Sequence, residues 1–285
     1  MLAVFLAANG LALGSLYALV AVGFSLIFGI TKVFHVAHGA VYLLVAYTYI
    51  QLSSVSIPLA IIASLVVAAA LGWLMNLAIY RPVQRARESF FTVFVASFGL
   101  TVLLSNLAAL AFGSDVKTPD GGLSAPVALG AIQMPAAELI GIGAAIVLFV
   151  GLRMVLQHTA MGVGLRAVAD DPALVMSVGL SSRRYTTVAF VLGSVLVVPA
   201  AVLMPYVQGV TPSVALNITT LALVATIVGG VGNLLGAAVA AFIFGIVQSM
   251  STLFLDAAWQ EAVAYAVLLL ILMFRPGGLM THKTA

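Results

Sequence analysis

The segment ITKVFHVAHGAVY (30–42) places two histidines and a lysine between two strongly apolar stretches. His35 and His38 are three residues apart, so they share one face of a helix, a spacing at which two imidazoles can bind a metal ion. No carboxylate or other imidazole lies nearby in the sequence to complete such a site. We therefore predict no metal and interpret the pair as interfacial or helix-capping residues, with Lys32 extending its ammonium group to water.

A second group of polar residues, DDPALVMSVGL (170–180), carries the signals of a short helix. Asp171 can accept hydrogen bonds from free N–H groups, and Pro172 suits the first helical position. Gly179 suits the left-handed conformation that ends a helix. These residues predict a helix from Pro172 to Val178 outside the membrane, on the cytoplasmic side. Its exposed apolar side chains are expected to be Leu174, Val175, Met176 and Val178.

This short helix has two interpretations. It can lie on the lipid surface as an amphipathic turn. It can also dock into a cytoplasmic protein subunit through its apolar side chains. A helix of this length buries too little surface for the sequence to decide between them.

The segment VGGVGNLLGAAVAAFIFG (228–245) combines a break with a slim helix. Gly229, Gly230 and Gly232 should interrupt a helix, and Asn233 can cap its restart. The small residues that follow allow close helix packing. The break is either a tight turn between two helices or a discontinuous helix whose N-terminus points at a substrate.

The stretch HGAVYLLVAY resembles LGAAVAAFIF in layout, so Gly39 and Gly236 are compatible with equivalent positions in two inverted repeats. If both breaks face a transport pathway, polar and small residues around them form its wall. The candidate wall residues are Thr31, His35, His38, Gly39, Tyr42, Thr226, Gly229, Gly230, Gly232 and Asn233.

Composition identifies the environment of these segments. Of 285 residues, 64% are hydrophobic and 7% are charged, whereas a soluble domain carries about 25% charged residues. Several apolar runs reach the ~20 residues that span a bilayer as a helix. The chain is therefore predicted to be an all-α polytopic membrane protein, a single transmembrane domain (1–285) with a cytoplasmic loop at 158–184. Its apolar segments are 2–30, 35–52, 57–80, 90–113, 136–157, 185–207, 216–229, 233–255 and 259–274.

The basic residues orient these segments. With alternating spans, ten of eleven Lys and Arg residues, Arg87 and Lys283 among them, fall on one side, and only Lys117 falls on the other. The positive-inside rule then places the C-terminus in the cytoplasm. This arrangement predicts nine crossings, or eight if the short segment 216–229 is re-entrant. Residues 2–30 would form a helix of about 44 Å, which must tilt or place its first turns along the interface.

The motifs of several enzyme and transporter classes are missing from the sequence. There is no G-x-x-x-x-G-K-[ST] phosphate loop, no G-x-S-x-G and no H-E-x-x-H. The acidic residues of the spans, such as Glu138, are expected near the outer helix ends, so an ionisable relay typical of ion-driven carriers is not visible. We predict that this chain is not an enzyme and does not hydrolyse ATP itself.

Several segments together resemble bacterial branched-chain amino acid ABC transporter permeases of the LivH type. They are NGLALGSLYALVAVGFSLIFGITKVFHVAHGAVY (9–42), YRPVQRAR (80–87), GVGLRAVADDPALVMSVGLSSRRYTTVAFVLGS (162–194), VGGVGNLLGAAVAAFIFGIVQS (228–249) and FRPGGLM (274–280). The resemblance implies a multi-pass inner-membrane subunit of an importer. It implies four partners around this chain: a second, related permease, two ATPases that bind ATP and Mg, and a periplasmic substrate-binding protein.

The resemblance also assigns roles to residues. The short helix corresponds to a coupling helix that seats on an ATPase, with Arg166, Asp170, Asp171, Pro172, Leu174, Val175, Met176 and Gly179 as coupling residues. Related permeases carry leucine-type amino acids, urea, short amides or aromatic acids, and amino acids are the main expectation here. His35 departs from a frequent asparagine of the family, which makes it a candidate for substrate selectivity. The rival interpretations are an ATP-independent channel or secondary carrier, and an intramembrane enzyme whose histidines bind metal.

Overall fold

The computed structural model describes residues 2–85, 89–129 and 132–280. Arg87 and Lys283, which entered the orientation argument, lie outside these ranges. The described chain is predominantly helical, as its apolar segments predicted, and the class of all-α polytopic membrane protein is confirmed.

The first half of the chain forms long helices joined by short connections. Its helices are α1 (Leu2–Thr31), α2 (His38–Ser53), α3 (Ile57–Met75), α4 (Arg81–Arg85) and α5 (Phe90–Phe112). A π-helical turn, Asn76–Tyr80, continues α3 into α4. Beyond α5, a 3₁₀ turn (Gly122–Ser124) precedes the antiparallel strands β1 (Pro126–Leu129) and β2 (Ile132–Pro135).

The second half alternates long and short helices. They are α6 (Ala136–His158), α7 (Ala160–Asp170), α8 (Pro172–Ser177), α9 (Ser182–Leu196), α10 (Val198–Leu203), α11 (Pro205–Gln208), α12 (Val214–Gly229), α13 (Leu234–Ser251) and α14 (Gln260–Phe274), with a 3₁₀ turn (Ala257–Trp259) before α14. Among the described residues, six helical segments are long and apolar enough to span a bilayer, and α12 and α14 are shorter apolar helices. The predicted eight or nine crossings stay a prediction.

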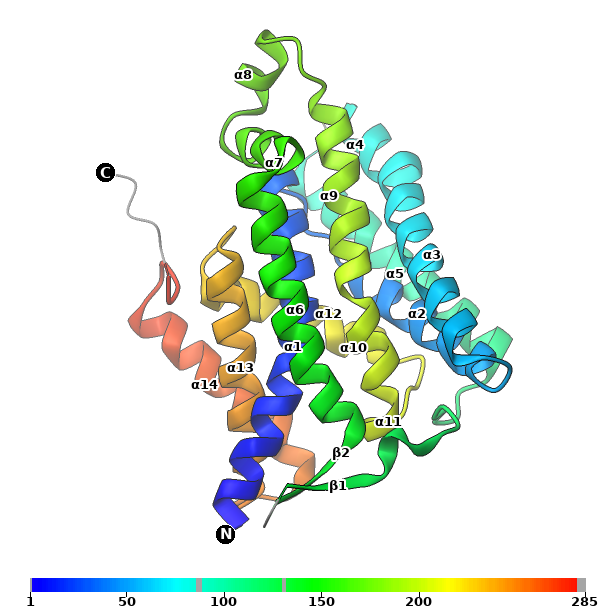
Figure 1. The fold of residues 1–285 in the computed structure, drawn as a ribbon. Helices are drawn as coiled ribbons and strands as arrows, with labels where there is room; N and C mark the ends of the chain where they lie inside the picture. The colour runs from blue at the N-terminus through cyan, green and yellow to red at the C-terminus, as the bar shows by residue number, and fades with distance from the viewer. Residues whose placement is uncertain (1, 86–88, 130–131, 281–285) are drawn as a thin grey trace.

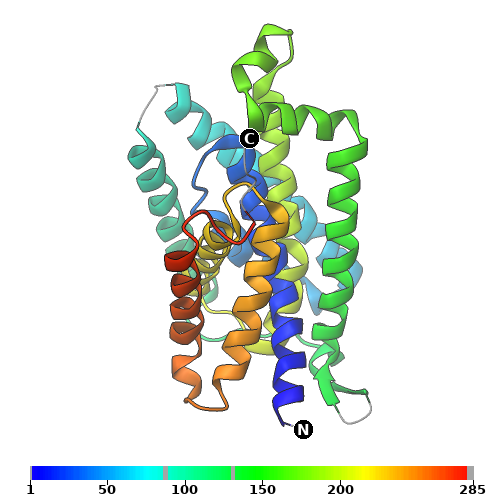
Figure 2. The same cartoon turned by 90° about the vertical axis from the view of Figure 1, so that its left-hand side faces the viewer.

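Helix α1 is the centre of the molecule. Its glycines allow close approach: a Cβ atom at Gly245 of α13 would lie 2.6 Å from Gly14 Cα and from Gly10 O. Figure 2 shows α1 between α13 and α14 on one side and α9 and α6 on the other. The chain is buried almost throughout from Gly10 to Ile30. From Gly10 onward α1 is thus largely enclosed by protein, because small residues let neighbouring helices pack closely. Whether the long helix tilts or places its first turns along the interface stays a prediction.

The two ends of the bundle differ in charge and structure. Helices α4, α7 and α8 and the C-terminal segment lie at one end, and the N-terminus and the β1–β2 hairpin at the other (Figure 1). Arg81 begins α4, Arg166 belongs to α7 and Arg184 to the first turn of α9. Lys117 pairs with Val210, two residues after α11, and α11 lies towards the opposite end (Figure 1). These elements agree with the predicted segregation of basic residues, and the orientation in the membrane stays a prediction.

Two connections contain structure that the sequence analysis did not predict. The loop 158–184 contains α7 before the predicted short helix; Thr159 caps it by accepting from Gly162 N at 3.0 Å. The polar connection 113–135 contains the β1–β2 hairpin. Both elements are short and depend on neighbours rather than on a long apolar run, so hydropathy alone does not reveal them.

Candidate functional site

The first helix break joins α1 to α2 through residues 32–37. Helix α1 ends where Lys32 takes a left-handed conformation, with φ +56°. The Lys32 ammonium donates to Gly29 O at 2.8 Å, and Thr31 Oγ1 donates to Ile27 O at 2.7 Å. A cation at the last free carbonyls stabilises a helix C-terminus. Lys32 is exposed, as predicted, and its side chain also caps the C-terminus of α1.

His35 lies in this break and is completely buried. Its Nδ1 atom lies 2.6 Å from the Tyr80 hydroxyl, which lies 2.6 Å from Ser97 Oγ. Ser97 Oγ also accepts from Ala37 N at 3.0 Å. His35 Nε2 has no hydrogen-bond partner among the described residues. The chain of hydroxyls therefore ties the break to α5 and to the end of α3.

Tyr80 reaches this position because of the π-helical turn. Asn76 and Tyr80, at the two ends of the turn, are both fully buried. A π turn inserts an extra residue into a helix, and it often marks a functional position. Tyr80 was not among the site residues predicted from the sequence. The sequence shows only that a tyrosine precedes the basic loop. Its contacts with His35 and Ser97 depend on the tertiary structure.

His38 opens α2 and is also completely buried. Its Nε2 atom lies 3.1 Å from Val20 O, so this nitrogen carries the hydrogen, because a carbonyl can only accept. Its Nδ1 atom has no partner among the described residues. The ring packs edge-to-face against Phe24, with centroids 5.9 Å apart. His38 thus binds the side of α1 and not its free end.

The first turn of α2 is held by α12. Gly39 N donates to Thr219 Oγ1 at 3.1 Å, and this hydroxyl lies 2.8 Å from both Val36 O and Ala215 O, to either of which it can donate. A Cβ atom at Gly39 would overlap the Ala215 carbonyl oxygen. The predicted wall residue Tyr42 is buried one turn further on. The break is therefore a closely packed junction in this conformation, in which one ring nitrogen of each histidine is without a partner among the described residues.

The second break lies between α12 and α13. Gly230 and Gly232 have φ values of +109° and +79°, which side-chain-bearing residues rarely adopt. Asn233 Oδ1 accepts from Gly236 N at 3.0 Å and caps α13, as predicted. Thr226, a predicted wall residue, is buried and donates to Ala21 O at 3.4 Å.

A C-terminal strap covers this second break. Leu279 N donates to Val228 O at 2.7 Å, and Met280 N donates to Gly229 O at 3.2 Å. Asn233 Nδ2 donates to Met280 O at 2.7 Å. The terminal segment, known from the sequence only as a family resemblance, thus closes over the glycines. Its backbone bonds could not be read from side-chain types.

The structure brings the two breaks together at one end of α1. A Cβ atom at Gly29 in the last turn would lie 3.2 Å from Gly232 Cα. Around this junction, the predicted wall residues His35, His38, Gly39 and Tyr42 are buried against other helices of the same chain. Their role in a pathway stays a prediction, and the conformation described here closes them off.

A polar face that the sequence analysis did not assemble lies on α5 and α12. Ser213, Asn217 and Thr220 are exposed and follow each other at spacings of four and three residues, so they share one face of α12. At one end of this face is a cavity of about 220 Å³ between α5 and α12, lined by Ser105, Asn106 and Ser213 among others. In the sequence, only the spacing of Ser213, Asn217 and Thr220 could have indicated a shared polar face.

Glu138 is an unexpected buried carboxyl group. It lies in the first turn of α6, near the end of the bundle where it was predicted, yet it is only 1% exposed. Both carboxyl oxygens are without a partner among the described residues. Its place at a helix N-terminus is favourable for negative charge.

The predicted short helix forms and projects from the bundle as α8 (Figure 1). Asp171 Oδ1 accepts from Ala173 N at 2.8 Å and from Leu174 N at 3.1 Å. Gly179 has a φ of +80°, as its predicted stop position requires. Arg166 and Asp170 are exposed on the adjoining α7.

The exposure of the α8 side chains needs one correction. Leu174 is 62% exposed and Met176 and Val178 are similarly open, as predicted. Val175 was expected to be exposed as well, and this was wrong: it is 4% exposed. Since α8 packs back towards α9, one apolar side chain faces the protein and the others face outward.

The family described as "Branched-chain amino acid transport system / permease component" matches residues 6–272. The high-affinity branched-chain amino acid transport system permease protein LivH of Salmonella typhimurium is 27% identical over 290 residues, which cover 95% of this chain and 93% of LivH.

Two further relatives are similar. The permease protein BraD of Pseudomonas aeruginosa, from a high-affinity branched-chain amino acid transport system, is 26% identical, covering 95% of this chain and 94% of BraD. A probable LivH of Methanocaldococcus jannaschii is 24% identical, covering 93% of this chain and 88% of the relative. No solved structure matches the chain.

Proposed function

Because this chain belongs to the branched-chain amino acid transport system permease family, we propose that it is the membrane-spanning subunit of an ATP-driven importer of branched-chain amino acids. The observation that carries this proposal is the family match over residues 6–272, which includes every helix break and the projecting α8. The chain is a multi-pass membrane protein, and the membrane is the bacterial inner membrane.

The proposed function requires several partner proteins. No phosphate loop is present, so ATP and Mg would be bound by two separate ATPase subunits. A periplasmic binding protein would deliver the solute, and a second, related permease would complete the membrane unit. The segregation of basic residues supports a cytoplasmic α7–α8 end and a cytoplasmic C-terminus.

We assign coupling to α8. Exposed apolar side chains at the tip of a protein are unfavourable in water unless a partner covers them, and Leu174, Met176 and Val178 supply such a surface. Asp171 and Gly179 hold both ends of the helix in place. An amphipathic helix that seats in a groove of a partner is a common mode of recognition. In this proposal, α8 transmits movement between the ATPase and the bundle.

We place the solute pathway along the polar face of α5 and α12, at the seam with the second permease. Asparagine and hydroxyl groups exposed at membrane depth are costly against lipid, so this face requires a polar or protein neighbour. A zwitterionic amino acid needs such groups along its path, and Asn217 and Thr220 offer them. Movement of α12 would open the buried junction at Gly39 and expose the histidines predicted from sequence.

The test is uptake of radiolabelled leucine, isoleucine and valine by proteoliposomes that contain the permease pair and both ATPases. We expect uptake that requires ATP inside the vesicles and binding protein outside. Uptake by this chain alone, driven by membrane potential or an ion gradient, would instead identify a channel or secondary carrier. Equal uptake of urea would remove the amino acid assignment while leaving the importer class intact.

A further inference from the structure

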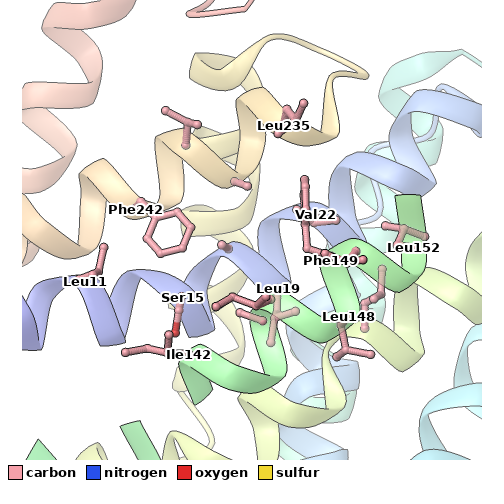
Figure 3. Close-up of a pocket in the computed structure, with 17 residues that line it drawn as sticks. Leu11, Ser15, Leu19, Val22, Ile142, Leu148, Phe149, Leu152, Leu235 and Phe242 are labelled. Atoms are coloured by element: carbon pink, nitrogen blue, oxygen red, sulfur yellow. The ribbon is translucent and has the colours of Figure 1, made fainter. Parts of the chain in front are cut away.

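A groove runs along the outside of the bundle between α6 and α13, with α1 as its floor. Both helices pack on α1. The groove has a volume of about 400 Å³. Figure 3 shows its lining, which includes Leu19 and Val22 of α1, Ile142 and Phe149 of α6, and Leu235 and Phe242 of α13.

The chemistry of this groove excludes an amino acid as its occupant. Its lining is apolar except for Ser15, whose hydroxyl already donates to Ala12 O at 2.6 Å. A site for a zwitterion needs several polar groups that converge on the charged ends of the ligand. The groove therefore suits a hydrocarbon chain and is separate from the proposed solute pathway.

At the α7–α8 end, the groove continues into a second cavity of about 310 Å³. Phe149, Leu152 and Leu235 line both cavities, so the two are adjacent and share a wall. The second cavity is also lined by Arg153, Gln157 and Arg166. As far as the described residues show, its lining contains two arginines and no acidic side chain. The apolar groove is thus followed, at the α7–α8 end, by a cavity with basic lining residues.

The dimensions match one leaflet of a bilayer. From Arg153 to Ile142, α6 rises by about 16 Å, at ~1.5 Å per residue. Half of the hydrocarbon core is about 15 Å deep. An acyl chain lying in the groove would therefore bring its phosphate to the level of Arg153, where the guanidinium is exposed and bonds Gln157 Oε1 through Nε at 3.4 Å.

From this charge complementarity and this shape, we propose that the groove between α6 and α13 binds an anionic phospholipid from the leaflet at the α7–α8 end, with one acyl chain on α1 and the phosphate at Arg153. Arginine is well suited to phosphate oxygens because it can donate two parallel hydrogen bonds. The lipid fills the space that separates α6 from α13, whereas at the other end of α6, Gly141 packs directly on Leu16.

Photocrosslinking in the assembled transporter tests the proposal. The photoreactive residue p-benzoylphenylalanine replaces Phe149 inside the groove, or Leu235 on the opposite wall if the first change prevents folding. The matched control replaces Val147, which is 69% exposed on α6 and does not line the groove. The complex is reconstituted in equal amounts of phosphatidylglycerol and phosphatidylcholine, irradiated, and the peptides are analysed by mass spectrometry.

We expect phosphatidylglycerol adducts to exceed phosphatidylcholine adducts about fivefold at position 149, because one basic residue near the surface favours anionic lipid to about this extent. At position 147 the ratio should be close to one. Arg153→Gln should reduce the ratio of phosphatidylglycerol to phosphatidylcholine adducts at position 149 to the value at position 147. Arg184→Gln removes a basic residue that does not line either cavity, and it should leave the ratio unchanged. Crosslinks from 149 to another protein chain, or equal ratios at 149 and 147 with Arg153 intact, would overturn the proposal.

Discussion

At the scale of single residues, the tightest constraint is the missing side chain of Gly39. Its Cα faces the Ala215 carbonyl and the Thr219 hydroxyl, which together hold the start of α2 against α12. A methyl group there would separate the two helices, and both belong to the buried centre of the bundle. The junction therefore needs glycine for close approach, not for its backbone freedom.

We predict that Gly39→Ala lowers the free energy of unfolding by about 3 kcal/mol, the upper end of the ~1–3 kcal/mol that overpacking typically costs, because the Cβ atom would meet backbone and not a flexible side chain. Thermal unfolding and size-exclusion profiles in detergent measure the effect. Gly99→Ala is the matched control, because a Cβ atom at Gly99 in α5 meets nothing within 4 Å. Equal stability of the two variants would show that α2 and α12 are not closely packed.

The hydroxyl of Tyr80 supports a second residue-scale prediction. Tyr80→Phe removes the group that bridges His35 and Ser97 and leaves buried polar atoms unpaired, which costs about 1–3 kcal/mol. We expect a lower unfolding temperature together with slower transport. Tyr185→Phe, a change at a half-buried tyrosine, should alter neither by a comparable amount. Loss of stability in both variants alike would argue against a special role for the bridge.

At the scale of elements, α8 joins a strong local helix signal to an exposed apolar tip. We predict that Asp171→Ala combined with Leu174→Glu abolishes transport and the stimulation of ATPase activity, while the protein still inserts and remains folded. Loss of the cap costs about 1 kcal/mol within the helix, and a charge replaces an apolar contact. ATP hydrolysis by the reconstituted complex, with and without binding protein, measures the effect.

Asp171→Asn is the control for this prediction, because asparagine also caps helices well. It should retain stimulated hydrolysis when Leu174 is unchanged. Uptake that is unaffected in the double variant would refute the assignment of coupling to α8.

In the connection between α12 and α13, the side chain of Asn233 makes two separate hydrogen bonds. Asn233 caps α13 through Oδ1 and holds the C-terminal strap through Nδ2. We predict that Asn233→Ala destabilises the protein by about 2 kcal/mol and Asn233→Ser by about half as much, because serine keeps the cap and loses the strap. Unfolding temperatures and protease sensitivity of the C-terminal segment distinguish the two. Identical behaviour of Ser and Ala variants would mean that the strap bond contributes little.

At the scale of the whole molecule, the polar face of α5 and α12 faces away from the bundle. At the buried junctions, by contrast, His35 Nδ1 and the Thr219 hydroxyl are bonded within their own chain. The exposed polar groups of this face, such as the Asn217 side chain, are open to a neighbour outside this chain. This arrangement favours a pathway shared between two permeases over one inside a single chain.

We therefore predict that Asn217→Leu reduces uptake at least tenfold without loss of folded protein. If this face met lipid, leucine would be neutral or stabilising, because an exposed asparagine is costly there. Gln51→Leu, an equivalent change at an exposed position outside the face, should leave uptake unchanged. Unchanged uptake in Asn217→Leu would exclude this face as the pathway wall.

Much of the architecture is encoded locally. Apolar runs predicted α1, α5 and α6 nearly to the residue, since a segment in lipid must satisfy its own backbone and therefore forms a helix. Asp171 and Asn233 mark helix starts through bonds to N–H groups two or three residues away. Family membership also follows from the sequence, because its motifs extend over the whole chain.

Tertiary structure alone decided which polar residues are used inside the chain and which face outward. His35 meets Tyr80 and Gly39 meets Thr219, contacts between residues 45 and 180 positions apart. In a membrane, nearly every helix face is apolar, so hydrophobic periodicity does not distinguish the buried side from the lipid side. That distinction depends on small residues that allow close approach and on hydrogen bonds completed across helices. For this reason the histidines could be located from the sequence, while their burial, the strap over the glycines and the groove on α1 could not.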